Sequence, residues 1–223
     1  MILALDTATP VGSVALYSSK GTVVNRYFNL GLQHSQRLFV EIEAALDTAG
    51  VGMEQLQAVA VSIGPGSFTG LRIGLSAAKG LCVAGDKALV AVSTLETLAA
   101  RLPFARFPVC AILDARKREV YTALYDTAGG VPVEQIGPRA IAPAQLAEER
   151  VGQPTIYTGD GAEVYRDLFG QQTLLAPPPC ARPDAGTIGW LALSKLERGE
   201  TVDIASAEPE YLRPPDAIPL PRK

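Results

Sequence analysis

The stretch from Ile63 to Gly74 reads IGPGSFTGLRIG. It continues the apolar run Ala58–Ile63, which predicts a buried strand. Pro65 fixes its own φ, and the glycines on either side of it tolerate angles that other residues avoid, so we expect a sharp turn. Ser67 can cap a helix that begins after the turn. The stretch therefore predicts a strand, a glycine turn and a helix, with backbone N–H groups placed where anions bind readily.

The helix expected over Thr69–Ala84 is apolar on two sides and contains three glycines. Each interior glycine costs about 1 kcal/mol relative to alanine, which indicates close packing. A helix that is apolar on most sides is buried in its own domain or docked on both faces. One stripe can serve the core of its own lobe, namely Ile73, Ala77, Leu81 and Ala84. The second stripe then remains for another surface, and it consists of Leu71, Leu75, Ala78 and Cys82.

The helix expected over Ser35–Ala49 is amphipathic. Its spacing predicts a core stripe, made of Leu38, Phe39, Ile42, Ala45 and Leu46. Val40 and Ala44 lie off that stripe. An apolar patch on a protein surface marks an interface. The partner interface that we expect therefore consists of Val40, Ala44, Leu71, Leu75, Ala78 and Cys82, although periodicity leaves open which stripe of the glycine-containing helix faces outward.

The glycine turn does not match the common nucleotide-binding patterns. A P-loop requires Gly-Lys-Ser/Thr, which is missing, and the glycine spacing differs by one residue from the dinucleotide fingerprint. Taken alone, this turn is weak support for a phosphate site.

The composition describes a globular chain. It has 223 residues, of which 48% are hydrophobic and 19% charged, so it can build a substantial core. The net charge of −3 argues against direct affinity for nucleic acid or acidic membranes. Three cysteines fit reduced thiols better than a disulfide framework. Because no signal peptide or apolar run of membrane-spanning length is found, we expect a cytoplasmic protein.

Two segments repeat one pattern at the same spacing. Leu5-Asp6-Thr7 is followed by Ala15-Leu16-Tyr17, and Leu113-Asp114-Ala115 is followed by Ala123-Leu124-Tyr125. In each, an apolar strand ends in an aspartate, which a turn and a second strand follow. Internal repetition of this kind predicts two lobes. We expect an N-terminal, partner-binding lobe over 1–103 and a C-terminal lobe over 104–223 that ends in a proline-rich tail.

An α/β chain of two lobes, each a mixed sheet with flanking helices, resembles the actin-like ATPase and sugar-kinase architecture, a ribonuclease H-like fold. In that superfamily the two hairpin aspartates hold metal and phosphates. The hairpin glycine that lets the backbone approach a phosphate is missing, because Ala8 and Arg116 stand in its place. The aspartates are either vestigial phosphate contacts or turn formers that accept backbone N–H bonds, and we favour the turn role. The candidate vestigial contacts are Asp6, Gly64, Gly66, Ser67, Arg72 and Asp114.

More specifically, the chain resembles the TsaB (YeaZ) family of partner proteins, which act in making threonylcarbamoyl-adenosine in tRNA. The stretches that carry the resemblance run from the first residues to the tail: ILALDTAT (2–9), HSQRL (34–38), GPGSFTGLRIG (64–74), AKGL (78–81), VSTL (92–95), DAR with EVY (114–121) and EPEYLR (208–213). The resemblance implies a non-catalytic subunit required for transfer of the threonylcarbamoyl group to the adenosine beside the anticodon.

The catalytic paralogue family, TsaD, resembles the first lobe but carries a His-x-x-x-His pair that holds a metal. Here Thr94 and Leu98 stand at those positions, and the chain has one histidine, His34. We therefore expect no metal site and no catalytic residues. His34 precedes a helix, and a local structural role is the favoured interpretation.

The resemblance also implies the partners. They are a TsaD-like paralogue, a TsaE-like ATPase and a second copy of this chain in a homodimer, with tRNA held only through the complex and no membrane involved. No intrinsic cofactor is implied, although ATP or ADP could sit at the junction between subunits. The alternative function is a free-standing small-molecule kinase or ATPase, which Asp6 and Asp114 favour and the missing hairpin glycines disfavour. For the basic run Arg116–Arg118, a solvated surface is the default interpretation.

Overall fold

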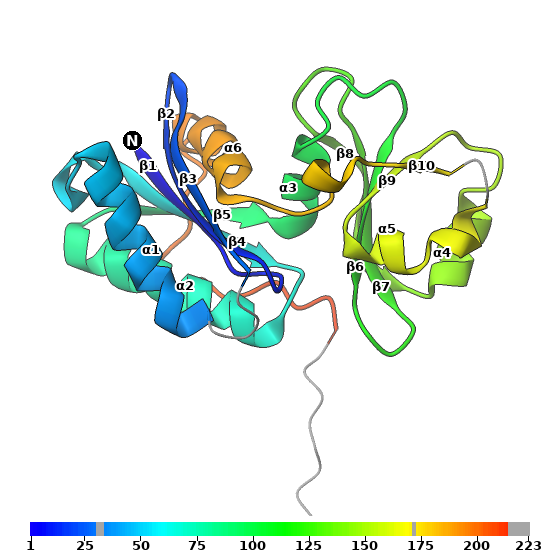
Figure 1. Cartoon of the computed structure of the whole chain (residues 1–223), viewed down its shortest axis with the longest axis horizontal. Helices are drawn as coiled ribbons and strands as arrows, with labels where there is room; N and C mark the ends of the chain where they lie inside the picture. The colour runs from blue at the N-terminus through cyan, green and yellow to red at the C-terminus, as the bar shows by residue number, and fades with distance from the viewer. Residues whose placement is uncertain (30–33, 171–172, 214–223) are drawn as a thin grey trace, which may run out of the picture.

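The computed structural model describes residues 1–29, 34–170 and 173–213, and it has two lobes that each contain a five-stranded mixed sheet (Figure 1). The first sheet has the order β3-β2-β1-β4-β5, and the second has the order β10-β9-β6-β7-β8. The strands are β1 (Ile2–Asp6), β2 (Gly12–Ser18), β3 (Gly21–Phe28), β4 (Ala58–Gly64), β5 (Ala88–Ser93), β6 (Val109–Asp114), β7 (Val120–Asp126), β8 (Val133–Ile141), β9 (Ile156–Thr158) and β10 (Leu174–Leu175).

The two sheets have the same topology. In each, a central strand pairs antiparallel with the strand that follows it and parallel with a later one: β1 with β2 and β4, and β6 with β7 and β9. The repeated aspartates end β1 and β6. The prediction of two similar lobes from the sequence echo is therefore confirmed.

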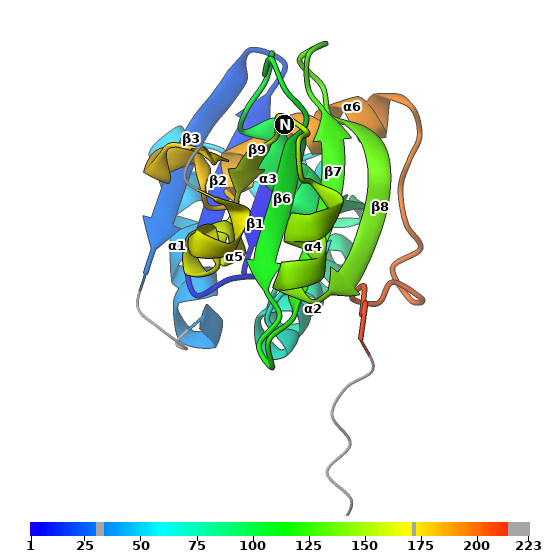
Figure 2. The same ribbon diagram turned by 90° about the vertical axis from the view of Figure 1, so that its right-hand side faces the viewer.

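Helices cover both faces of both sheets (Figures 1 and 2). The alternation of side chains along the strands explains this, since residues of β1 such as Leu3 face one helical layer and Ile2 faces the other. The helices are α1 (His34–Ala49), α2 (Phe68–Gly85), α3 (Thr94–Ala100), α4 (Pro143–Glu149), α5 (Asp160–Val164) and α6 (Ala185–Glu197), with short 3₁₀ turns η1 (Met53–Gln55), η2 (Arg166–Phe169) and η3 (Pro178–Cys180).

The outer layer of the first lobe consists of α1 and α2, whose apolar residues pack on the face of the first sheet that carries Leu3. In the second lobe, α4 and α5 form the outer layer on the second sheet. Between the two sheets lie α3 and α6 (Figure 1). The central strands of each sheet are therefore buried on both faces, whereas the edge strands β3 and β8 remain largely exposed or half-buried.

The two inner helices exchange lobes. α3 follows the first sheet in the chain but packs on β6 and β7, whereas α6 follows the second sheet but packs on β1 and β2. The expected boundary between residues 103 and 104 therefore does not hold in space, because α6 and the segment after it return to the first lobe. A buried ion pair at the crossing joins Arg101, which ends α3, to Asp184, the N-cap of α6. The chain thus runs from the first lobe to the second and back.

Candidate functional site

The glycine turn between β4 and α2 is closed against the first hairpin of the chain. The N–H of Ser67 donates to the carbonyl of Ala8 at 2.7 Å, and the Ser67 hydroxyl accepts the N–H of Gly70 at 3.2 Å. A Cβ at Gly66 would lie 2.5 Å from the same Ala8 oxygen. Gly64, with φ +127°, packs against the Glu210 backbone. The N–H groups of Ser67 and Gly70, which a phosphate would need as donors, are already hydrogen-bonded within the protein. The turn therefore acts as a packing element.

Two of the four glycines of α2 are explained by this closure. A Cβ at Gly70 would lie 2.0 Å from the carbonyl oxygen of Thr7, and one at Gly74 would lie 2.3 Å from the Thr7 hydroxyl. Gly80 differs, because within the described part of the chain a Cβ there would meet no atom within 4 Å. The fold of this chain gives no packing reason for Gly80.

The hairpin aspartates both form turns. Asp6 accepts the N–H of Ala8 at 3.1 Å, and Asp114 accepts the N–H of Arg116 at 3.0 Å, each two residues on. Asp6 is fully buried, and its Oδ1 also accepts the hydroxyl of Ser62 at 2.6 Å. Its Oδ2 has no hydrogen-bond partner among the described residues. Burial raises the pKa of the Asp6 carboxyl above its ordinary value, against the opposing effect of the hydrogen bonds it accepts.

The structure corrects the expected interface residues on α2. Leu71, Leu75, Ala78 and Cys82 are buried and face the sheet, so they do not form an exposed patch in this chain. The other stripe also packs inward as expected, since Ala77 is buried and Ile73 and Leu81 pack against the same core. The exposed residues of α2 include Arg72, Ser76, Gly80, Val83 and Ala84. Burying leucine and isoleucine removes more apolar area from water than burying alanine or glycine would.

The helix α1 differs from its predicted pattern at one position. Leu38, Ile42 and Ala45 are buried as expected, but Phe39 is 54% exposed. Its neighbour Val40 is 50% exposed, in line with its expected place off the core stripe, while Ala44 is half-buried. The side chain of His34 lies outside the described part of the structure.

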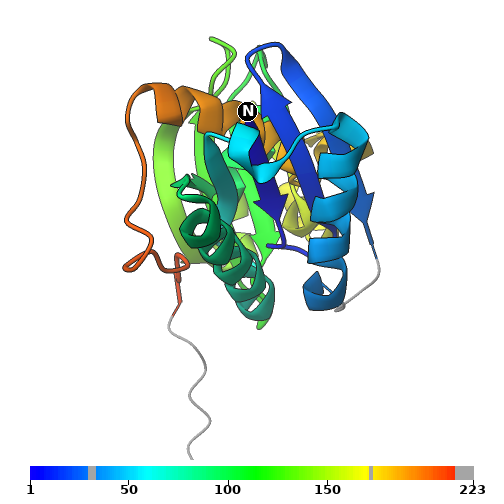
Figure 3. The ribbon, with the colours of Figure 1, turned by 90° about the vertical axis from the view of Figure 1, so that its left-hand side faces the viewer.

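Figure 3 shows α1 and α2 side by side in front of the first sheet. Together they present an outer surface that combines apolar and small residues. We name this surface the outer face and define it as Phe39, Val40, Ser76, Gly80, Val83 and Ala84.

The tail crosses from the first lobe to the second at the start of α2. The N–H of Glu210 donates to the carbonyl of Ile63 at 2.7 Å. The Arg72 guanidinium lies 3.7 Å from the centre of the Phe68 ring and donates from Nε to the Tyr211 hydroxyl at 2.9 Å. Two residues further, Arg213 pairs with Glu119 of the second lobe at 2.9 Å. Arg72 therefore anchors the tail, and phosphate binding is not needed to explain it.

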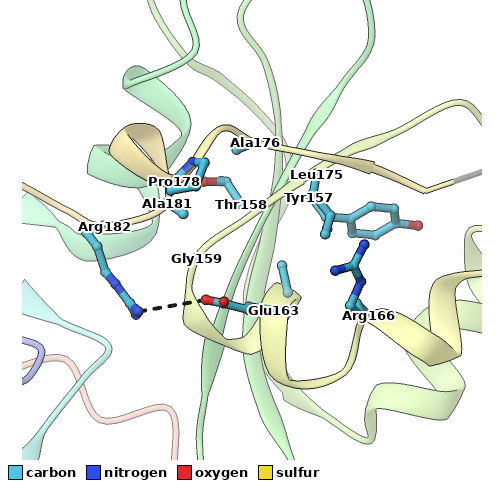
Figure 4. A pocket seen from close by; sticks show the side chains of 11 residues that line it. Tyr157, Thr158, Gly159, Glu163, Arg166, Leu175, Ala176, Pro178, Ala181 and Arg182 are labelled. Atoms are coloured by element: carbon cyan, nitrogen blue, oxygen red, sulfur yellow. Dashed lines mark ion pairs between the residues drawn. The ribbon is translucent and has the colours of Figure 1, made fainter.

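A cavity of about 440 Å³ lies in the second lobe beside the turn between β9 and α5 (Figure 4). Gly159 at this turn has φ +100°, and a Cβ there would lie 2.1 Å from the carbonyl oxygen of Ile112. Arg182 projects toward Glu163 and approaches it at 3.9 Å (Figure 4). No feature of the sequence indicated the cavity. Its lining includes Arg166 as well as the Arg182–Glu163 pair, and this arrangement points to no particular reaction.

Other reactive groups are few in the described part of the chain. No cluster of three or more His, Cys, Asp or Glu residues there could hold a metal ion. Burial raises the pKa of the Cys110 thiol to about 11, which keeps it protonated. None of the helices described here is both long and apolar enough to cross a membrane.

Comparison with known proteins identifies the relatives of this chain. Residues 30–218 match the family model described as TsaD, tRNA N6-adenosine threonylcarbamoyltransferase. The tRNA threonylcarbamoyladenosine biosynthesis protein TsaB of Escherichia coli K12 is 36% identical, over 95% of this chain and 94% of the relative. The crystal structure of YeaZ from Pseudomonas aeruginosa superposes with a TM-score of 0.81 at 33% identity, over 95% of this chain and 99% of that one.

A more distant likeness concerns the fold alone. The ROK hexokinase of Thermus thermophilus superposes with a TM-score of 0.50 at 10% identity, over 89% of this chain and 99% of that chain. This likeness places both lobes in the actin-like ATPase and sugar-kinase fold class, as the sequence predicted.

Proposed function

The chain belongs to the TsaB family and has a role in tRNA threonylcarbamoyladenosine biosynthesis, and on that premise we propose that it acts as a non-catalytic subunit that docks on a TsaD-like paralogue through the outer face. The same surface pairs two copies of the chain when the paralogue is absent. A TsaE-like ATPase is the third component of the assembly, and any ATP or ADP binds at a junction between subunits.

The observation that carries the proposal is the make-up of the outer face. Phe39, Val40 and Val83 expose apolar surface on two adjacent helices, where a solvated face would be polar. Gly80 lies three residues before Val83 on the exposed side of α2, and as a glycine in a helix interior it lowers the stability of the helix. A helix pair packs at an interaxial distance set by the side chains at the contact, so a glycine with open space above it favours close approach by a partner helix.

A two-fold symmetric homodimer is the simplest way to cover such a face in the free chain. The paralogue then competes for it, and the heterodimer forms at the expense of the homodimer. The closed glycine turn and the missing histidine pair support a subunit without chemistry of its own, and they weigh against the alternative of a free-standing kinase or ATPase.

The test uses gel filtration with light scattering on the chain alone and on its mixture with the paralogue. Val83→Glu places a charge on the outer face, where it faces water in the free chain but would be buried and unpaired in either dimer. We expect a well-folded monomer that binds the paralogue at least about 100-fold more weakly, since buried unpaired charges cost several kcal/mol.

The matched control is Val133→Glu, which adds the same charge at an equally exposed valine on β8 of the other lobe. It should assemble like the wild type. Wild-type assembly by the Val83→Glu variant would refute the docking face. ATP turnover by the purified chain alone would refute the non-catalytic role.

A further inference from the structure

The hairpin between β6 and β7 ends in an unusual tip. Arg116, Lys117 and Arg118 have φ values of +61°, +53° and +62°, so three consecutive residues with side chains occupy the left-handed region. Glycine, asparagine and aspartate are the residues that normally occupy it. Two backbone hydrogen bonds close the loop. The N–H of Ala115 donates to the carbonyl of Glu119 at 3.1 Å, and the N–H of Glu119 donates to the carbonyl of Arg116 at 3.0 Å.

The equivalent tip in the first lobe shows that this conformation is not demanded by the topology. Residues 7–11, all of which the structure describes, contain no positive φ. Backbone strain of this kind persists where surrounding structure enforces it, and it gathers at functional positions. Asp114 contacts this turn, since its Oδ1 accepts the Arg116 N–H and its Oδ2 pairs with the Arg116 guanidinium at 3.2 Å, but the equivalent bond from Ala8 to Asp6 accompanies no positive φ.

The three residues at the tip are also all cations, and all are exposed. The side chain of Arg116 is 82% exposed despite its contact with Asp114, so that ion pair is largely solvated and weak. Adjacent like charges repel one another. The tip therefore combines strain with charge repulsion while contributing no buried side chain to the core. In Figures 1 and 2 it protrudes from the lower end of the second lobe.

The basic surface continues beyond the tip. Arg213 reaches Glu119 at the base of the hairpin, and the tail that carries it is anchored by Arg72 at the start of α2. Two further arginines thus lie between α2 and the hairpin of the second lobe: Arg72, which anchors the tail, and Arg213, which is ion-paired with Glu119. The net charge of −3 does not cancel this local surface, because salt screens charges that lie more than about 8–10 Å away.

The chemistry of the tip favours one kind of partner. Protein interfaces are built around apolar and aromatic anchors and are depleted in lysine, whereas the tip has no apolar side chain. Contacts to a phosphate backbone use arginine and lysine and need no apolar anchor. The pathway of this family acts on tRNA, which carries a phosphate at every nucleotide.

We propose that Arg116, Lys117 and Arg118 bind backbone phosphates of tRNA when the chain is assembled with its paralogue. This inference rests on the proposed function. It goes beyond it by giving the chain a direct contact with the RNA that is independent of nucleotide sequence.

The test compares two triple variants in the complex of the full chain with its paralogue. The first is Arg116→Gln, Lys117→Gln and Arg118→Gln. The control is Lys20→Gln, Arg106→Gln and Arg198→Gln, which removes the same charge at exposed residues elsewhere. Gel filtration first checks that each complex assembles, and fluorescence anisotropy then measures binding of unmodified tRNA between about 50 and 200 mM salt.

We expect the tip variant to assemble normally and to bind tRNA at least tenfold more weakly at low salt. The slope of log K against log salt should fall by roughly 2, as for two or three lost phosphate contacts. The control should keep the wild-type slope. An unchanged slope in the tip variant would overturn the proposal.

Two further outcomes identify a protein partner for the tip and also overturn the proposal. One is loss of assembly with the paralogue by the tip variant alone. The other is loss of binding to the ATPase component with tRNA affinity intact. Failure of the wild-type chain to bind the paralogue would refute the proposed function itself, and with it this inference.

Discussion

The two hairpin aspartates illustrate how one residue type at equivalent positions acquires different properties. Asp6 and Asp114 both accept an N–H two residues on, as expected from the turn chemistry of aspartate. The sequence could predict this local role because it depends on neighbouring residues. It could not predict that Asp6 is fully buried with one oxygen that has no hydrogen-bond partner among the residues the structure describes, since that depends on strands brought together from distant parts of the chain.

We predict that Asp6→Asn stabilises the protein at neutral pH. Because burial raises the pKa of Asp6, the fold favours the protonated carboxyl. That contribution is complete below the ordinary pKa of 3.8 and is lost as the pH rises through the raised pKa. Asparagine keeps an oxygen for Ser62 and Ala8 but does not ionise. Thermal melts from pH 4 to 8 should show that the melting temperature of the variant rises relative to that of the wild type as the pH increases. At pH 8 the variant should melt about 2–4 °C higher or more.

The control for this prediction is Asp167→Asn, at an exposed aspartate of η2. Its melting temperature should follow the wild type at every pH. If the melting temperature of Asp6→Asn exceeds that of the wild type by the same amount at every pH from 4 to 8, ionisation of Asp6 is not the cause.

At the scale of the element, α2 has two sides with opposite requirements. The turn and the helix were predicted from IGPGSFTGLRIG. That residues of both apolar stripes pack inward could not be predicted, because both stripes have helical spacing and only packing against the first sheet and Thr7 decides how much of each is covered. For this reason a charge at Leu75, which is buried in the core, would unfold the lobe and would not report on docking.

The glycines of α2 give a paired prediction. Gly80→Ala should raise the stability of the free chain by about 0.5–1 kcal/mol, because alanine is the better helix former and its Cβ meets open space. Gly74→Ala should destabilise the chain by about 1–3 kcal/mol, because its Cβ would displace the Thr7 hydroxyl, which donates to the Gly70 carbonyl at 2.7 Å. Urea denaturation of the two variants measures both.

The same pair tests the role of the outer face. If a partner helix approaches Gly80 closely, the stabilising Gly80→Ala change should weaken binding to the paralogue. A variant that is both more stable and equally able to bind would argue that Gly80 lies outside the contact.

At the scale of the whole molecule, the exchange of α3 and α6 makes the two lobes interdependent. The internal repeat predicted two lobes of similar topology. It does not say which sheet a helix covers, so the boundary at residue 103 was placed by sequence order. In the structure, α6 buries Ile188 and Leu191 against β1 and its neighbours, some 180 residues away in the chain.

Because of this exchange, we predict that both lobes unfold in one cooperative transition. Trp190, the only tryptophan, lies on α6 and reports on the first lobe, whereas far-ultraviolet circular dichroism reports on both. The two curves should coincide in urea. Ile188→Ala leaves a cavity beneath the first sheet and should cost about 2–5 kcal/mol. It should shift both curves to lower urea together, since a first lobe that opens releases α6 and with it the Arg101–Asp184 pair, which joins α6 to the end of α3 on the second sheet. A tryptophan transition that moves alone, with a second circular dichroism transition left behind, would show that the second lobe folds without the first.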